Sequence, residues 1–382
     1  MPCYIYVALT GEDKILIFTL NTETGGIEFQ SQMRVLGGPA KLAIDPEHRF
    51  LYIVCNPGFN RPIRTEGDSE LSGYQIDWKT GGLKLINTIS LQFAPAYLAM
   101  DRKGRFLLSA YYSSGKVSVH PVNNIGEIGE AVQWLDTGGG AHCIQTDPSN
   151  RFAFVPHIAM SYANKDHWIH ATSAKYILAH GSNAILQFFF DDIKGNLTLN
   201  SPEKVVAEKG AGPRHFCFHP KIDVLYFSNE QGSSVTAYRF NSLMGTLSDF
   251  QTVSTLPEGY KGQNACSSIR ISHSGRFVYV PNRGHDSIAC FSTDTVTGQL
   301  TLIETVPTEA HPFELSLDPE GKFLFVVGRD SGRMAAYRVI EDNGKLQPLQ
   351  TYAVGKKPLD VLITKSAHNI SEVHFGHSKT PN

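Results

Sequence analysis

The sequence predicts an all-β fold, a seven-bladed β-propeller, and three observations lead to this prediction. A phrase made of a turn, a basic residue and a short hydrophobic strand recurs along the chain. A glycine two residues before an aliphatic residue recurs at positions typical of hairpins. Segments at the two ends of the chain resemble successive strands of one repeat. Repetition of short strands indicates a propeller, in which each blade is a small sheet packed against its neighbours.

The repeated phrase is clearest at residues 45–50, where it reads Asp-Pro-Glu-His-Arg-Phe. Its six copies begin at Asp45, Asp101, Asp147, His219, Ser272 and Asp318. Successive copies are separated by 56, 46, 72, 53 and 46 residues, and roughly 40–50 residues is typical of a propeller blade. We expect the longest interval to hold an insertion near residues 159–180 that lies over one face of the propeller.

Seven glycines mark the hairpins, where a positive φ angle favours glycine. They are Gly25, Gly81, Gly126, Gly195, Gly245, Gly298 and Gly344. Seven hairpins and six phrases leave one blade to be assembled from the chain ends. Residues 358–363 resemble an innermost strand and residues 4–7 resemble the next strand, so we expect N- and C-terminal strands to pair and close the ring. The predicted propeller covers residues 1–365, and residues 366–382 form a polar tail that we expect to fray.

Composition and charge exclude several classes of protein. Of the 382 residues 41% are hydrophobic, and the formal net charge is −2, which favours neither disorder nor nucleic-acid binding. No stretch approaches the ~18 apolar residues of a membrane span, and residues 1–10 lack the basic start of a signal peptide. The six cysteines form no CxxC pair. We therefore expect a cytoplasmic protein with reduced thiols and no membrane partner; the sequence does not predict an oligomeric state.

Comparison of equivalent positions in the blades exposes a candidate site. Five residues before each phrase, on the innermost strand, the blades carry Ala40, Ala96, His142, Arg214, Ser267 and Phe313. At the end of the second strand they carry Asn56, Tyr112, Ile158, Glu230, Arg283 and Arg329. Equivalent positions of neighbouring blades converge around the axis. The ionisable residues at both registers are therefore expected to surround one pocket.

These residue types suit acid–base chemistry on an anionic ligand. A His and a Glu can act as general acid and base, and guanidinium groups bind a carboxylate or a phosphate through paired N–H donors. Each residue alone also has an ordinary structural explanation. An Arg at a strand end can bridge to the next blade, and a His on an inner strand can bond a backbone carbonyl. Their coincidence at matched registers favours a functional cluster.

One segment resembles a known family. Residues 210–220 read Gly-Ala-Gly-Pro-Arg-His-Phe-Cys-Phe-His-Pro and are followed by Ser-Asn-Glu at 228–230; this is similar to the signature of the seven-bladed lactonase family. That family includes the bacterial propeller-type 6-phosphogluconolactonase and the fungal carboxy-cis,cis-muconate cyclase. The resemblance extends from Tyr4 to about Thr364, and the segments 140–142, 282–283 and 352–355 also fit the family pattern.

The resemblance implies that four residues line the active site, which we take as the catalytic set, and we expect a substrate-binding set around them, of which Arg329 lies outside the family motif. The catalytic set is His142, Glu230, Arg214 and Arg283. The substrate-binding set is Arg329, His215, His157 and Asn282. Two departures from the family pattern leave the substrate open. Phe313 stands after Pro312, where the bacterial phosphogluconolactonase pattern has an Arg, and the insertion near 159–180 has no counterpart in the typical bacterial enzyme.

We expect no metal and no cofactor. Four histidines in or beside the insertion, with Asp166, provide a metal-binding alternative, but their spacing matches no recognised zinc arrangement; they are His157, His167, His170 and His180. The sequence has no Gly-x-Ser-x-Gly elbow and no dinucleotide fingerprint, which argues against serine nucleophilic catalysis and nucleotide use. A lid over the channel mouth is the favoured interpretation of the insertion.

The sequence therefore predicts metal-independent hydrolysis of a sugar-acid lactone by acid–base catalysis in the mouth of the central channel. The small-molecule substrate is expected to carry a carboxylate or a phosphate, as 6-phosphogluconolactone or a related hexonic or uronic lactone does. Either Glu230 or His142 takes the proton from water, and an Arg faces the developing oxyanion. Two alternatives remain: a lactone-forming carboxymuconate cyclase, and a non-enzymatic propeller that binds protein partners.

Overall fold

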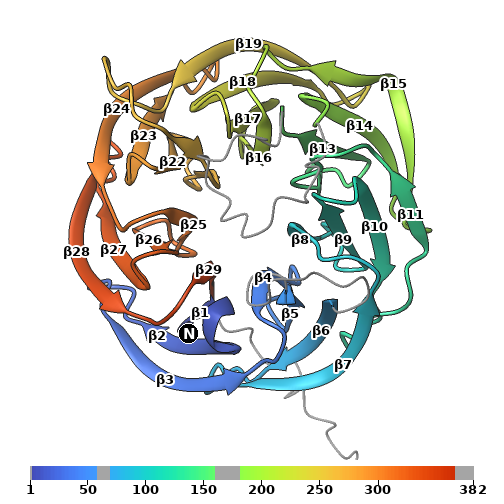
Figure 1. Ribbon diagram of the computed structural model, residues 1–382, viewed down its shortest axis with the longest axis vertical. Helices are drawn as coiled ribbons and strands as arrows, with labels where there is room; N and C mark the ends of the chain where they lie inside the picture. The colour runs from blue at the N-terminus through green and yellow to red at the C-terminus, as the bar shows by residue number, and fades with distance from the viewer. Residues whose placement is uncertain (1, 58–68, 160–180, 366–382) are drawn as a thin grey trace, which may run out of the picture.

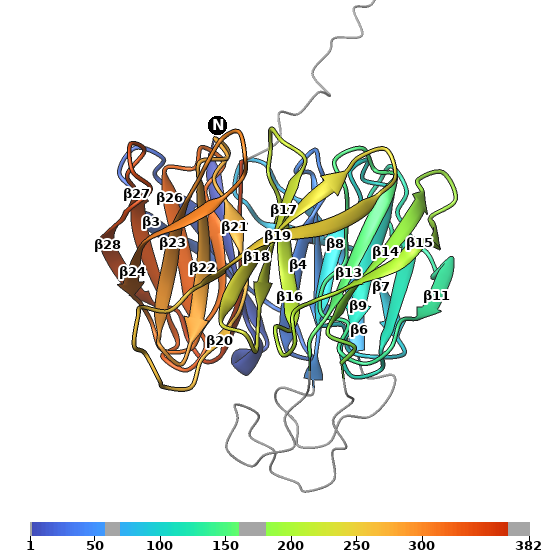
Figure 2. The same ribbon diagram turned by 90° about the horizontal axis from the view of Figure 1, so that it is seen from above.

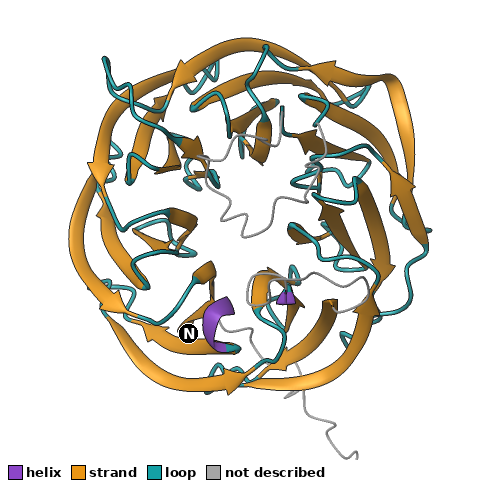
Figure 3. Cartoon of the chain, viewed as in Figure 1, coloured by secondary structure: helices purple, strands orange, loops and turns teal. Residues whose placement is uncertain are grey.

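A computed structural model of the chain describes residues 2–57, 69–159 and 181–365. These residues form seven antiparallel sheets arranged around a central axis (Figure 1). In six sheets the strand that comes first in the chain lies nearest the axis, and in the remaining sheet the last strand of the chain does. Strands dominate the described regular structure, and a single-turn 3-10 helix, Thr10–Glu12, follows the first strand (Figure 3). The predicted all-β, seven-bladed propeller is confirmed.

The strands are given blade by blade, from the axis outward. The blade that closes the ring contains β29 (Pro358–Lys365), β1 (Cys3–Leu9), β2 (Lys14–Leu20) and β3 (Ile27–Arg34). The second blade contains β4 (Pro39–Ile44), β5 (Phe50–Cys55), β6 (Ser69–Ile76) and β7 (Leu83–Leu91). The third contains β8 (Tyr97–Met100), β9 (Phe106–Tyr111), β10 (Lys116–Pro121) and β11 (Gln133–Asp136). The fourth contains β12 (Gln145–Thr146), β13 (Phe152–His157), β14 (Ala184–Asp191) and β15 (Asn196–Val206). The fifth blade contains β16 (Pro213–Phe218), β17 (Val224–Asn229), β18 (Ser234–Asn241) and β19 (Thr246–Ser254). The sixth contains β20 (Ala265–Cys266), β21 (Arg270–Ile271), β22 (Phe277–Arg283), β23 (Ser287–Thr293) and β24 (Leu300–Pro307). The seventh contains β25 (Pro312–Leu317), β26 (Phe323–Gly328), β27 (Arg333–Val339) and β28 (Leu346–Ala353).

The ring closes as expected, by pairing of the two ends of the chain. Strand β1 pairs with β29 in an antiparallel ladder, in which Tyr4 lies opposite Thr364 and Val7 lies opposite Val361. The hydrophobic core lies between the blades rather than at the axis. At this closure, for example, Val7 packs in one cluster with Phe325 of the preceding blade.

The Asp residue that begins the repeated phrase closes a turn with its side chain. Asp45 Oδ1 accepts hydrogen bonds from the backbone N–H groups of Arg49 and Phe50 at 2.6 and 2.7 Å. Equivalent bonds form at Asp101 and Asp147. A carboxylate that receives the N–H groups of the turn fixes where the next strand begins. This local interaction explains why the phrase recurs in the sequence.

The hairpin glycines have a second role besides their backbone conformation. All seven have a positive φ angle. A Cβ atom built at Gly245, where φ is +69°, would lie 2.0 Å from the ring of Phe152 in the preceding blade. Phe152 is the strand-opening residue of a repeated phrase, so the phrase of one blade packs on the hairpin of the next. Glycine is required at this position for space as well as for φ.

We predict that Gly245→Ala lowers the melting temperature of the protein much more than Gly259→Ala does. Both glycines have a positive φ angle, but a Cβ at Gly259 meets nothing within 4 Å. The backbone strain is therefore shared, and only Gly245→Ala adds a clash with Phe152. The clash costs about 1–3 kcal/mol more. Thermal unfolding of the two variants checks this, and equal melting temperatures would contradict it.

Several expectations fall outside the described residues. The insertion predicted near 159–180 lies there apart from its first residue, and so does the polar tail of residues 366–382. No helical segment in the part of the chain that the structure describes has the length and apolarity needed to cross a membrane. Viewed from the side, the blades form a short cylinder whose strands run roughly between its two faces (Figure 2).

Candidate active site

Four of the predicted residues come from three neighbouring blades, from strand positions at or near the axis. His142 lies just before β12, and its backbone N–H donates to Pro156 O at 3.0 Å. Arg214 is the second residue of β16, and Glu230 directly follows β17 of the same blade. Glu230 N–H donates to Gly212 O at 2.7 Å, which ties the two strands together where both residues emerge. Arg283 ends β22 of the next blade.

The side chains of His142, Arg214 and Arg283 converge on one carboxylate oxygen of Glu230. Arg214 Nε lies 2.9 Å from Glu230 Oε2, and Arg283 Nη2 lies 3.3 Å from the same oxygen. His142 Nε2 lies 3.8 Å from it. Blade comparison in the sequence therefore brought together residues that meet in space. We call these four residues the Glu230 cluster.

Exposure differs within the Glu230 cluster and suggests different tasks. The Arg214 side chain is 1% exposed, whereas the side chains of Arg283, His142 and Glu230 are 10%, 12% and 21% exposed. Arg214 lies behind the carboxylate and cannot meet a solute directly. The other three side chains keep an accessible edge, so a bound molecule would meet an imidazole, a carboxylate and a guanidinium group.

The two guanidinium groups are fixed by more than the carboxylate. Arg283 donates through Nη2 to Cys266 O at 2.8 Å and through Nε to Ala265 O at 3.3 Å. Both Arg214 and Arg283 also lie over the ring of Phe313, at 5.8 and 5.7 Å from its centroid. A ring face attracts cations through its quadrupole. Phe313 therefore lowers the repulsion between two guanidinium groups that share one carboxylate.

Burial and positive neighbours hold His142 in its neutral form. Desolvation lowers the pKa of His142 well below its ordinary value, and the charges of Arg214, Arg283 and Lys41 lower it further. Burial, with repulsion from Arg283, also lowers the pKa of Arg214, to about 10, and Glu230 opposes this shift. At neutral pH the Glu230 cluster thus contains a neutral imidazole beside charged guanidinium groups, so His142 can accept a proton.

His215 contacts the Glu230 cluster but is buried behind it. Arg214 Nη1 lies 3.1 Å from His215 Nε2. A guanidinium group can only donate, so Nε2 must be the acceptor and the proton of the neutral ring is on Nδ1. The His215 ring also packs edge-on against those of His142 and Tyr97, with centroids at 5.3 and 4.9 Å. His215 is therefore positioned to orient Arg214, and its substrate-binding role stays a prediction.

Two other predicted substrate-binding residues are fully buried, and their contacts are those of packing residues. His157 ends β13, its Nδ1 lies 3.0 Å from Val155 O, and burial lowers its pKa to about 4. Asn282 precedes Arg283 and points the other way, because successive strand residues face opposite sides. Its side chain donates to Thr255 O and accepts from Thr255 Oγ1. The substrate-binding role of these two residues stays a prediction.

Arg329 shares the strand-end register of Glu230 and Arg283 but lies in the following blade, directly after β26. Its guanidinium group donates to both carboxylate oxygens of Asp330, at 2.7 and 3.1 Å. Its charge also helps to lower the pKa of His311. Arg329 is therefore a neighbour of the Glu230 cluster, and its guanidinium group pairs with Asp330 rather than with Glu230.

The residue that sequence reasoning passed over is Tyr112. Its ring packs edge-on against the imidazole of His142, with centroids 5.6 Å apart. Tyr112 occupies the strand-end register of Glu230, so the same blade comparison had already brought it into view. Its uncharged side chain gave no chemical reason to single it out.

Metal-ligating side chains do not gather in the described residues. Within ranges 2–57, 69–159 and 181–365, no group of three or more His, Cys, Asp or Glu side chains has an arrangement that suits a metal ion. Of the residues weighed as an alternative metal site, His167, His170, His180 and Asp166 lie outside these ranges.

The fold and the Glu230 cluster define the chain as a seven-bladed propeller with a group of ionisable side chains near its axis. The sequence matches the family model "Lactonase, 7-bladed beta-propeller" over residues 4–363, and the chain belongs to that family.

Known proteins of similar sequence or structure agree with this assignment. The chain is 30% identical over 363 residues to 6-phosphogluconolactonase of Pectobacterium carotovorum, covering 95% of this chain and 99% of that protein. It is 30% identical over 340 residues to 6-phosphogluconolactonase of Bacillus subtilis, covering 88% and 90% of the two chains. The solved structure of Pseudomonas aeruginosa periplasmic gluconolactonase has a TM-score of 0.83 at 22% identity, covering 96% and 100%. This last likeness shows a shared fold.

Proposed function

We propose that this protein hydrolyses a sugar-acid lactone that carries a carboxylate or a phosphate. The observation that carries this proposal is the convergence of His142, Arg214 and Arg283 on one oxygen of Glu230. Hydrolysis of a cyclic ester needs a base for water, stabilisation of an oxyanion, and a proton for the leaving oxygen. The Glu230 cluster contains groups for each of these tasks, and the family relationship points to the same reaction.

His142 is the general base in this mechanism. Its imidazole is neutral because burial and cationic neighbours lower its pKa, and it accepts a proton from a water molecule as that water attacks the lactone carbonyl carbon. Glu230 lies 3.8 Å from His142 Nε2 and stabilises the imidazolium that forms. Arg214, buried behind Glu230, holds the carboxylate in place and acts as a positioning residue.

Arg283 stabilises the oxyanion that develops on the carbonyl oxygen. Its side chain keeps an accessible edge and its orientation is fixed by two backbone carbonyls. When the tetrahedral intermediate collapses, the bond between the carbonyl carbon and the ring oxygen breaks. The ring oxygen takes the proton from His142 and becomes a hydroxyl group, and the carbonyl carbon becomes the carboxyl group of the product.

Surplus positive charge around Glu230 supports an anionic substrate. The cluster holds two guanidinium groups and one carboxylate, and Arg329, whose charge is paired with Asp330, lies in the next blade at the same register. We propose that a substrate carboxylate or phosphate pairs with this charge. We also propose a cytoplasmic location, which the six unpaired cysteine thiols support.

A panel of substrates tests the proposed function. Proton release is followed from 6-phosphoglucono-, glucono-, galactono- and aldaric lactones, and each rate is corrected for spontaneous opening. Ultraviolet loss of carboxymuconate is followed in parallel. We expect acceleration of at least one anionic lactone and no loss of carboxymuconate. Turnover of carboxymuconate alone would favour a lactone-forming cyclase, and no turnover of any compound would favour a binding propeller.

We predict that kcat/KM for the lactone stays high below pH 6.5. Since the neutral imidazole of His142 is the active form and its pKa lies below the ordinary value, activity is lost only when the pH falls through this lowered pKa. The acid limb of kcat/KM reports the free enzyme. A pH–rate profile checks this, and an acid limb centred at or above pH 6.5 would contradict the assignment of His142 as the base.

We further predict that hydrolysis needs no added metal ion. Three protein side chains supply the base and the charge stabilisation, so prolonged dialysis against a chelator should leave kcat within about twofold of the untreated enzyme. The measurement is the lactonase rate before and after chelation, with divalent ions added back. Loss of activity that one added divalent ion restores would overturn this prediction.

A further inference from the structure

A second group of charged side chains lies one residue further along the innermost strands. Lys41 of β4, Glu314 of β25 and Asp360 of β29 occupy equivalent positions, directly after the register of Arg214 and Phe313. All three side chains are buried. We call them, with Arg270, the axial charge layer.

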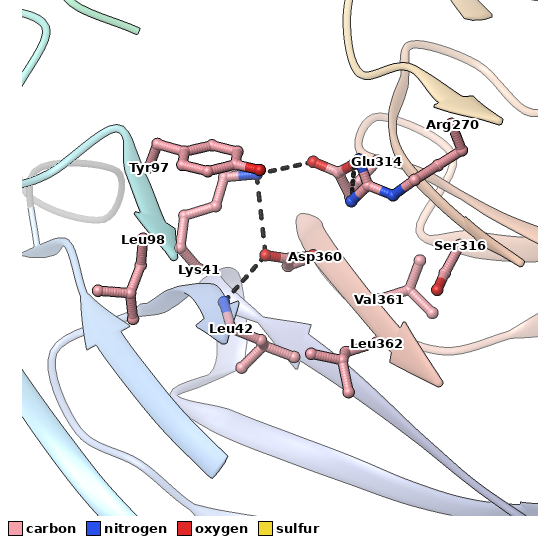
Figure 4. A pocket seen from close by; sticks show the side chains of 10 residues that line it. All are labelled: Lys41, Leu42, Tyr97, Leu98, Arg270, Glu314, Ser316, Asp360, Val361 and Leu362. Atoms are coloured by element: carbon pink, nitrogen blue, oxygen red, sulfur yellow. Dashed lines mark hydrogen bonds and ion pairs between the residues drawn. The ribbon is translucent and has the colours of Figure 1, made fainter. Parts of the chain in front are cut away.

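The members of the axial charge layer pair with one another in a continuous network. Lys41 Nζ donates to Glu314 Oε2 at 2.9 Å and lies 3.8 Å from Asp360 Oδ2 (Figure 4). Arg270 Nη2 lies 3.1 Å from Glu314 Oε1. Asp360 Oδ2 accepts a further hydrogen bond from the backbone N–H of Leu42 at 3.0 Å. At neutral pH two positive and two negative charges therefore balance within one group, and because burial raises the pKa of Asp360 to about 6, its negative charge is lost in acid.

A polar cavity of about 210 Å³ adjoins the axial charge layer, and the charged members contribute to its lining (Figure 4). Buried ion pairs seldom stabilise a fold better than apolar residues of similar size. Four charged groups beside a cavity are therefore an expensive way to fill the propeller axis. The desolvation of these four charged groups is therefore better explained by an effect of the axial charge layer on the Glu230 cluster.

Phe313 connects the axial charge layer to the Glu230 cluster. It directly precedes Glu314, and its ring lies 5.6 Å from Lys41 Nζ as well as 5.8 and 5.7 Å from the guanidinium groups of Arg214 and Arg283. The two groups of charges thus meet at one aromatic ring. In this desolvated region electrostatic interactions extend further than they do in water.

Charges of the layer act on the site in opposite directions. Lys41 lowers the pKa of His142 and that of His215, and Glu314 opposes the lowering of the Arg214 pKa. The titratable and charged groups around His142 come from several blades: Tyr112, Arg214, His215, Glu230, Arg283 and Lys41. Those around Glu314 are Lys41, Arg270, Arg214, Asp360 and Tyr97.

We propose that Lys41 and Glu314 are positioning residues of this lactonase, whose opposed buried charges set the electrostatic potential at His142 and at the guanidinium groups of Arg214 and Arg283 without touching the substrate. The inference rests on the proposed function. Asp360 completes the charge balance of Lys41, and Arg270 completes that of Glu314.

The two charges predict opposite effects of their removal. Glu314→Gln leaves excess positive charge beside the site, so the pKa of His142 falls. The base is then weaker and kcat decreases, while KM for an anionic lactone also decreases. Lys41→Met leaves excess negative charge, so the pKa of His142 rises and KM increases. We expect the acid limb of kcat/KM to move by about one pH unit, downward in the first variant and upward in the second.

The experiment measures kcat, KM and the pH profile of Glu314→Gln, Lys41→Met and the double variant. The double variant removes both charges and should move the acid limb less than either single variant does, because the two opposed changes in charge cancel. The control is Glu320→Gln, which removes a unit charge from an exposed ion pair with Lys365 and should leave the profile unchanged. Shifts in the same direction, or no shift in either single variant, would overturn the proposal.

A titration without substrate separates this proposal from the proposed function. The His142 ring is followed by NMR in protein with isotope-labelled histidine, with His142→Asn used to assign its signal. Lys41→Met should raise the titration midpoint of His142 whether or not any lactone is turned over. An inactive wild type with this shift would reject only the proposed function, whereas an active wild type without it would reject only the role of Lys41 and Glu314.

Discussion

His142→Asn is expected to lower kcat for the lactone by about 10²–10⁴-fold, the range that a general acid–base group contributes. Asn keeps a polar side chain of similar size, but it cannot take a proton from water or return one to the ring oxygen. The loss should be in kcat rather than KM, because the imidazole acts on the water and the ring oxygen. Steady-state rates corrected for spontaneous opening give this number directly.

The fold should survive this change. His142 lies in the segment before β12, and the backbone N–H that ties it to Pro156 is unaffected by the substitution. A melting temperature close to that of the wild type would show that the loss is chemical. A kcat within a factor of about three of the wild-type value would mean that His142 is not the base.

Arg283→Met is expected to lower kcat by about 10²–10³-fold, the loss measured when one preorganised oxyanion donor is removed. Met retains most of the length of the side chain but has no charge and no N–H donors. Arg283→Lys retains the charge without the planar fork, so its rate should fall between those of Arg283→Met and the wild type. The measurement is kcat for all three proteins at saturating lactone.

Arg329→Met is the matched control for Arg283→Met. Arg329 has the same register in the next blade, but its guanidinium group is already paired with Asp330. Its loss should raise KM for an anionic lactone and leave kcat nearly unchanged. If Arg329→Met lowered kcat as much as Arg283→Met does, the oxyanion would have to lie between the two blades, and the assigned role of Arg283 would be wrong.

The architecture could be predicted because the interactions that determine it join residues that are close together in the sequence. The Asp45 carboxylate bonds to N–H groups only four and five residues away, and the hairpin glycines satisfy a backbone conformation within one turn. Each signal repeats in several blades, so one weak copy does not hide the pattern. Closure by β1 and β29 was predictable for the same reason, since each strand resembles its counterparts in other blades.

The four members of the Glu230 cluster could be predicted from the sequence, but the side chains packed around them could not. Equivalent registers bring His142, Arg214, Glu230 and Arg283 together because the propeller repeats its geometry. The burial of His215 behind Arg214 could not be predicted, because the ladder between β16 and β17 shifts register between Pro213 and His215. Such a bulge changes which way neighbouring side chains face, and it leaves no clear mark in the sequence.

The axial charge layer was invisible to sequence reasoning for a different reason. Lys41 and Glu314 are 273 residues apart and belong to different blades. Their pairing follows from an exact match of register between two strands, at a position where the other blades carry Tyr, Cys, His and Ser. The partner of a charged residue on an inner strand can be identified only from the three-dimensional structure of the closed ring.

The most direct test of the account is a crystal structure of the protein with bound aldonate product, gluconate or 6-phosphogluconate. The account predicts that the new carboxylate lies within hydrogen-bond distance of Arg283 and His142, and that its C5 hydroxyl group, formed from the ring oxygen of a δ-lactone, lies close to His142. A product bound away from the Glu230 cluster, for example in the cavity beside Lys41 and Glu314, would contradict the central claim.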